Sequence, residues 1–183
     1  VVLQSQPQST VTVTITPNAQ LTVAPSPLSF TSANWNVAQT VTVTAANDNV
    51  VEGAHSGTLG FAVASADPAY GGVTLAGITA AITDNDSATV SFSPASVSQS
   101  EATSPMVYTV TLSNPVASGV TATVSTSNGT ATAGMDYTAI TGQTVTFAPG
   151  STTAQTVSVA ITNDALDEDD ETYTLSLSNL VAT

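Results

Sequence analysis

The chain has 183 residues, 42% of them hydrophobic, and its formal net charge is −13 because it contains 13 acidic residues and neither lysine nor arginine. A surface without basic side chains cannot attract the phosphates of nucleic acid or an anionic membrane, so both partners are excluded. The absence of cysteine excludes disulfides, thiolate metal sites and cysteine catalysis, and no apolar run is long enough to insert into a membrane.

Alternation of apolar and hydroxyl side chains predicts β-strands along the whole chain. The alternating segments are, in order, Ser9–Ile15, Gln39–Ala45, Ala88–Phe92, Met106–Leu112, Gln143–Ala148, Gln155–Ile161 and Thr172–Ser178. Valine, isoleucine and leucine would face a core while threonine and serine face water. Turn signals such as TPN, APSP and SNGT separate the segments, and no stretch has a helical period. This pattern predicts an all-β fold of antiparallel immunoglobulin-like β-sandwiches.

An internal repeat predicts two tandem domains. AQTVTVTAANDNVVEG (Ala38–Gly53) matches AQTVSVAITNDALDED (Ala154–Asp169) at an offset of 116 residues. The polar stretch TDNDS (Thr83–Ser87) would separate the copies, which gives domains at 1–86 and 87–183. Each copy then has about 90 residues, the size of one sandwich domain.

The acidic residues gather in loops at strand ends. Asp48 and Glu52 follow one strand with the same spacing as Asp164 and Glu168 after its repeat. Two carboxylates about 4 Å apart repel by roughly 4 kcal/mol at an effective dielectric constant near 20, and no lysine or arginine can relieve this. Loops that offer only oxygen ligands favour Ca²⁺ over transition metals. The alternative, solvated acidic loops without an ion, is disfavoured by the repeated spacing.

The second copy resembles a known family. Its segment Asn128–Asn179 contains the pattern G-T-A-x-A-G-x-D-Y, then T-V-x-F-x-P-G, then an acidic loop that ends D-E-x-Y, and it is similar to a Calx-β domain. Through Leu28–Gly53 and Ala80–Asp86, the first copy resembles a divergent relative found in large bacterial surface proteins. The first copy lacks the G-T-A-x-A-G-x-D-Y segment.

The resemblance implies a seven-stranded sandwich that binds Ca²⁺ at one tip, and it assigns ligands in both copies. In the second copy the matching positions are Glu101, Asp136, Asp164, the carbonyl of Leu166, Glu168 and Glu171; in the first they are Asp48, the carbonyl of Val50, Glu52, Asp84 and Asp86. Asn163 stands where the family often has aspartate. Against the family frame, the first strand of copy one and the last strand of copy two are expected to be missing.

Together these features predict a structural, non-enzymatic calcium-binding module at the bacterial cell surface. It would extend and rigidify an adhesin or biofilm-matrix fibre, with neighbouring repeats as partners. The missing strands leave two explanations open: either they lie in a longer parent protein, or a neighbouring chain donates a strand and the assembly forms a filament. An alternative of a different class is an extracellular binding module that presents loops to a glycan or protein. A hydrolase built on paired carboxylates is disfavoured, since few aromatic residues are available to hold a sugar.

Overall fold

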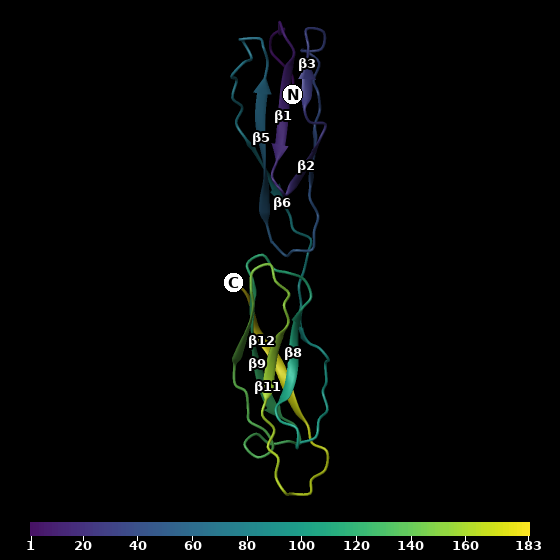
Figure 1. Cartoon of the computed structure of the whole chain (residues 1–183), viewed down its shortest axis with the longest axis vertical. Helices are drawn as coiled ribbons and strands as arrows, with labels where there is room; N and C mark the ends of the chain where they lie inside the picture. The colour runs from purple at the N-terminus through teal and green to yellow at the C-terminus, as the bar shows by residue number, and fades with distance from the viewer. The chain divides into compact units, whose positions relative to one another are not determined.

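The computed structural model describes residues 1–183, and all of its regular elements are β-strands (Figure 1). The all-β prediction is thereby confirmed. The chain divides into two compact units: unit 1 comprises Val1–Asp48 and Gly53–Asp84, and unit 2 comprises Asn49–Glu52 and Asn85–Thr183. The structure contains no helix with the length and apolar character of a membrane span.

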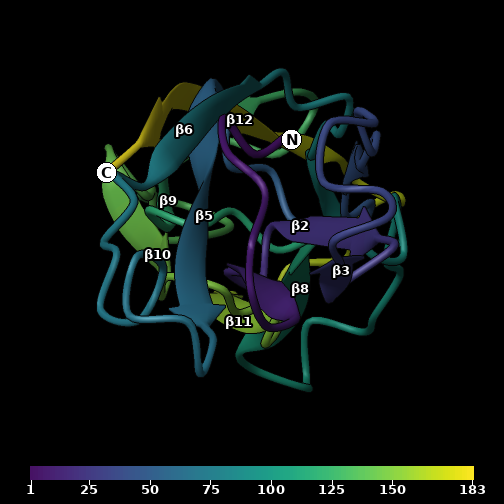
Figure 2. The same cartoon turned by 90° about the horizontal axis from the view of Figure 1, so that it is seen from above.

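Unit 1 is built from a four-stranded and a two-stranded antiparallel sheet. Its strands are β1 (Val11–Pro17), β2 (Leu21–Ala24), β3 (Leu28–Phe30), β4 (Thr42–Ala45), β5 (His55–Ala64) and β6 (Ile78–Ile82). The larger sheet has the order β3-β1-β5-β6, and β5 and β6 lie side by side in Figure 2. On β1, Val11, Val13 and Ile15 are buried and the threonines between them face outward, so the period-two pattern places its apolar face in the core.

A close approach between the two sheets of unit 1 requires a glycine. Gly57 on β5 lies under the side chain of Leu21, a core residue of β2 that is 5% exposed. A Cβ at position 57 would come within 2.6 Å of Leu21 Cδ1 and 2.9 Å of Cδ2. The glycine therefore lets β2 pack directly onto the backbone of β5.

Asp67 is the buried acid of unit 1. Its side chain is 4% exposed, and its oxygens accept hydrogen bonds from the backbone N–H groups of Gln8 at 2.7 Å and Ala69 at 2.9 Å. These two hydrogen bonds hold the pKa of Asp67 below its usual value of 3.8. The ionised carboxylate thus ties the N-terminal segment to the loop after β5.

Unit 2 is a sandwich of two three-stranded sheets. Its strands are β7 (Val90–Phe92), β8 (Met106–Leu112), β9 (Val120–Asn128), β10 (Gln143–Phe147), β11 (Gln155–Val159) and β12 (Tyr173–Ala182). The sheet orders are β10-β9-β12 and β11-β8-β7. Val110 and Val157 from one sheet meet Val124 and Phe147 from the other in a single buried cluster. β12 lies at a sheet edge, and strand donation to it, like the missing strands, stays a prediction.

The sequence pattern missed strands that contain small residues. β5 includes Gly57 and Gly60, although glycine is a residue type that is rare in strands. β9 has the small residue Ala122 at a core position. Both are central strands of their sheets. These two segments are strands because one face of each is buried in the core, and this burial cannot be recognised from the type of any single residue.

A substitution at Gly57 tests the packing of unit 1. We expect Gly57→Ala to destabilise unit 1 by about 1–3 kcal/mol, because the new methyl group overpacks against Leu21. Gly60→Ala on the same strand is the matched control, since its Cβ would meet only Thr16 O at 3.7 Å. Urea denaturation of the two variants measures the difference. Equal stabilities would show that Leu21 can move aside.

Candidate metal centre

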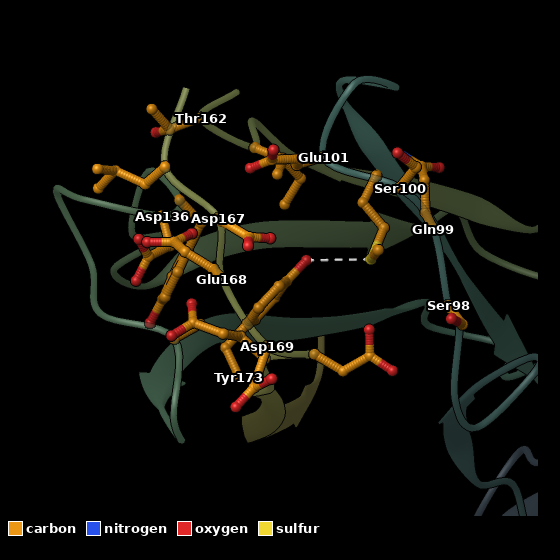
Figure 3. Close-up of a pocket in the computed structure, with 17 residues that line it drawn as sticks. Ser98, Gln99, Ser100, Glu101, Asp136, Thr162, Asp167, Glu168, Asp169 and Tyr173 are labelled. Atoms are coloured by element: carbon orange, nitrogen blue, oxygen red, sulfur yellow. Dashed lines mark hydrogen bonds between the residues drawn. The ribbon is translucent and has the colours of Figure 1, made fainter. Parts of the chain in front are cut away.

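Three loops of unit 2 surround an acidic pocket of about 520 Å³ (Figure 3). The loop between β7 and β8 contributes Glu101, the loop between β9 and β10 contributes Asp136, and the loop between β11 and β12 contributes the remaining acids. The acidic lining residues are Glu101, Asp136, Asp167, Glu168, Asp169, Asp170 and Glu171. A run of carboxylates that is continuous in sequence thus meets two acids from distant loops.

Within the pocket, three carboxylates come within the dimensions of a single ion. One oxygen atom from each of Asp136, Glu168 and Glu171 lies within 4.8 Å of the other two. Calcium takes oxygen ligands at about 2.3–2.6 Å, so ligands on opposite sides of the ion are separated by up to about 5 Å. The donor set therefore fits Ca²⁺ in both chemistry and size.

Backbone hydrogen bonds shape the loop that carries Asp136. Asp136 Oδ2 accepts the N–H of Thr132 at 2.7 Å, and the N–H of Asp136 returns to Thr132 O at 3.0 Å. Gly134, at φ 89°, makes the tight turn between them. The carbonyl of Asp136 accepts the N–H of Thr162 at 2.9 Å, which joins this loop to the segment after β11.

The remaining predicted ligands of unit 2 lie on the two other loops. Asp164 Oδ1 accepts the N–H of Leu166 at 2.7 Å, a side-chain turn that places Leu166 on the pocket wall. Glu101 is half-buried, next to a turn closed by the N–H of Thr103 on Ser100 O. Asp164 is not among the residues that line the pocket, but its charge acts on Glu168.

Lost hydration, together with repulsion among these acids, raises the pKa values of two glutamates. The pKa of Glu168 lies above its usual value of 4.5 because of lost hydration first, and then because of the charges of Asp164, Asp136 and Glu101. The pKa of Glu171 is raised by lost hydration, by the charge of Asp136 and by a hydrogen bond with the Asp136 carboxylate. Without a metal, a proton is the cation that relieves this pocket.

A cluster of tyrosines lies below the carboxylates. The rings of Tyr137 and Tyr173 stack with centroids 4.4 Å apart at 17°. Tyr108 donates its hydroxyl hydrogen to Tyr173 at 2.8 Å, and Tyr173 donates to Met106 Sδ at 3.3 Å. Loss of hydration is the main cause that raises the pKa of Tyr173 far above its usual value. Tyr137 and Tyr173 of this cluster line the floor of the acidic pocket.

The predicted ligands of the first copy are placed as follows. Asp48 is exposed in the loop after β4, and Asp84 Oδ2 accepts the N–H of Gly53 at 2.8 Å. Val50, Glu52 and Asp86 are half-buried. Metal ligation by these five residues stays a prediction.

The structure also contains site residues that sequence reasoning did not find. Thr132 and Asn128 bind the loop of Asp136 through hydrogen bonds, and Tyr137 forms the floor. The SNGT motif that contains Asn128 reads as an ordinary turn. Only the proximity of Tyr137 to Asp136 in the DY pair was an available signal.

A family model for the Calx-beta domain matches residues 83–183, the segment that forms nearly all of unit 2. The chain belongs to the Calx-beta domain family. The resemblance predicted for the second copy is thereby confirmed, and the matched segment includes all the acids of the pocket. No curated protein matches the chain.

Solved structures that match this chain include domains of Calx proteins. The apo form of the Calx CBD1 domain shares 22% identity over 51% of this chain and 81% of its own, with a TM-score of 0.48. CBD12 from CALX1.2 shares 16% identity over 98% of this chain and 71% of its own, with a TM-score of 0.43. CBD12 of CALX1.1, a calcium-binding domain, shares 17% identity over 94% of this chain and 67% of its own, with a TM-score of 0.45.

The raised glutamate pKa values predict how the metal-free protein responds to pH. Glu168 and Glu171 bind protons more tightly in the folded state than in the unfolded state. The stability of unit 2 in EDTA should therefore increase as pH falls from 7 to about 5, and decrease as pH rises. Differential scanning calorimetry across this range measures the trend, and Glu171→Gln should flatten it.

Unit 1 supplies the internal control for this experiment. The pKa of Asp67 is lowered from 3.8, so its contribution to stability is present above that value and disappears only as pH falls below it. The unfolding midpoint of unit 1 should not rise between pH 7 and about 5. A parallel rise in both units would contradict the assignment to the pocket.

Proposed function

We propose that unit 2 binds Ca²⁺ in the acidic pocket. The observation that carries the proposal is the convergence of Asp136, Glu168 and Glu171 within 4.8 Å in a chain that has no lysine or arginine to neutralise them. Glu101, Asp164 and the carbonyl of Leu166, on the loops around the pocket, would complete the oxygen ligands. Bound calcium supplies the positive charge that the chain itself lacks.

The donor set favours calcium over other common metals. The pocket lining contains neither histidine nor cysteine, the ligands that zinc and copper prefer. Magnesium requires a compact octahedral shell, whereas calcium accepts six to eight oxygens from flexible loops. Three loops of acidic and carbonyl oxygens suit the larger ion.

The wider role that this site supports is mechanical and non-enzymatic. Ca²⁺ would cross-link the three loops of unit 2 and so stiffen one module of a secreted bacterial surface protein. Repetition of such modules would extend and rigidify an adhesin or matrix fibre outside the cell. The tandem units and the family membership support this proposal, since repeat proteins gain length by adding similar domains.

One observation favours the alternative of a binding module. Met135 is 70% exposed and Leu166 is 67% exposed, and they stand on two of the loops that bear the acids. Exposed apolar side chains beside a polar site are typical of surfaces that contact a partner. In this alternative, calcium would fix the loops that a glycan or protein contacts.

Calcium titration tests the proposed function directly. Extracellular sites of this kind have a Kd on the order of 10⁻⁴–10⁻³ M. For a Kd of ~10⁻⁴ M, ~10 mM Ca²⁺ should stabilise unit 2 by about 2.7 kcal/mol over EDTA. Double substitution of Asp136 and Glu171 by their amides should abolish this gain and raise the metal-free melting temperature.

The matched control removes one negative charge from a residue that is not a predicted ligand. Asp170→Asn changes the net charge in the same acidic loop, and it should retain most of the calcium-dependent stabilisation. An unchanged melting temperature of the wild-type protein between EDTA and ~10 mM Ca²⁺ would disprove the calcium site.

Small-angle scattering tests the mechanical role. If calcium stiffens the tandem, scattering profiles in Ca²⁺ should show a narrower distribution of dimensions than profiles in EDTA. If the first copy's predicted ligands also bind Ca²⁺ and so lock the hinge to the second copy, Asp48→Ala with Glu52→Ala should lose this difference. Asp164→Ala with Glu168→Ala should mainly destabilise unit 2. Equal effects of the two double variants on overall dimensions would argue against a mechanical role for the first copy's acids.

A further inference from the structure

Asp136 reaches the pocket from a loop that must keep its shape while the pocket is free of metal. The loop leaves β9 at Asn128, which pairs with Tyr173 of the neighbouring strand β12. Asn128 Oδ1 accepts two hydrogen bonds from the loop: one from the hydroxyl of Tyr137 at 2.7 Å and one from the N–H of Ala133 at 3.0 Å. Those donors lie on both sides of Asp136 in sequence.

Through Tyr137, Asn128 is also connected to β12, the strand that begins two residues after Glu171. Tyr137 is 1% exposed, and its ring stacks on Tyr173, two residues after Glu171. Asn128 and Tyr173 are opposite each other in the antiparallel pairing of β9 with β12, so the stacked rings lie next to this residue pair. Asn128 therefore fixes the loop of Asp136 against the start of β12.

A backbone connection between the same two segments reinforces this geometry. The N–H of Ala131 donates to Thr172 O at 3.0 Å, and the N–H of Thr172 donates to Thr130 Oγ1 at 2.8 Å. Gly129 lies so close that a Cβ there would overlap the carbonyl of Thr172. Two hydrogen bonds and a close packing contact thus join the loop of Asp136 to the residue after Glu171.

We propose that Asn128 is a positioning residue for the metal site: it holds Asp136 at the distance from Glu171 that one calcium ion spans. This inference rests on the proposed function of the pocket. Asn128 is not itself among the pocket-lining residues, and it acts through Tyr137 and Ala133. A loop that is not held in advance must be ordered by the ion, which weakens binding. Removal of such outer partners typically reduces metal affinity by about 10-fold to 100-fold.

Four single variants test the proposal by calorimetric titration with Ca²⁺ below the metal-free melting temperature. Asn128→Ala, which loses both hydrogen bonds, should weaken binding by about 10-fold. Tyr137→Phe, which loses one, should weaken it by about threefold. Asn128→Asp keeps an acceptor oxygen for both donors, and its added negative charge attracts the cation, so it should not weaken binding. Ser127→Ala is the matched control, because it removes a hydrogen bond to Thr174 between the same strands without touching the loop.

A second measurement separates positioning from mere stability. Terbium, which takes the same oxygen ligands as calcium, is excited by nearby tyrosines, and its luminescence lifetimes in H₂O and D₂O report the number of bound waters. In Asn128→Ala, a displaced Asp136 should be replaced by about one additional water. A variant that is only less stable would bind terbium with wild-type hydration.

The outcomes are distinguishable. If the wild-type protein binds neither ion, the proposed function fails. If the wild-type protein binds and Asn128→Ala binds with the same affinity and hydration, the positioning role is overturned while the calcium site stands. If Asn128→Ala does not fold, Tyr137→Phe decides: weaker binding supports the role, and unchanged binding overturns it.

Discussion

Repulsion between carboxylates that have no cationic side chain to pair with is the constraint on which the acidic end of unit 2 depends. In most proteins lysine or arginine neutralises such clusters, but this chain contains neither. The acids can be accommodated by water, by protons, by N–H donors or by a metal ion. Each of these leaves a different trace in the structure, and the pocket of unit 2 shows two of them: carboxylates close enough for one ion, and glutamates whose pKa values are raised.

In this chain, backbone N–H groups donate the hydrogen bonds to carboxylates that lysine and arginine side chains donate in other proteins. Asp67, Asp136 and Asp164 each accept at least one backbone N–H at 2.9 Å or less. These donors bind carboxylate oxygens without adding a charge, and they fix the orientation of the carboxylate. A loop built in this way can place several carboxylates in a defined geometry although they repel one another.

The sequence, together with the family resemblance, predicted the fold class, most strand positions and four of the acids that line the pocket: Glu101, Asp136, Glu168 and Glu171. Alternation is a local property, so strands such as β8 and β11 could be read directly, and the D-x-x-x-E repeat marked the loop that contains Glu168. The contribution of Asp136, from a distant loop, came from the family resemblance. Asn128 could not be found, because its role arises from the pairing of β9 with β12 and from the stacking of Tyr137. Those contacts depend on tertiary structure rather than on local pattern.

The acidic loop between β11 and β12 also determines which proteases can attack the module. Trypsin-like enzymes cleave after lysine or arginine and find no site anywhere in this chain. Glutamate-specific proteases, in contrast, have Glu168 and Glu171 as cleavage residues on an exposed segment. A cation held by these same carboxylates would remove both from the reach of such an enzyme. The composition that creates the repulsion thus also narrows the range of proteases that can cleave the protein, and it leaves these two glutamates as exposed cleavage positions.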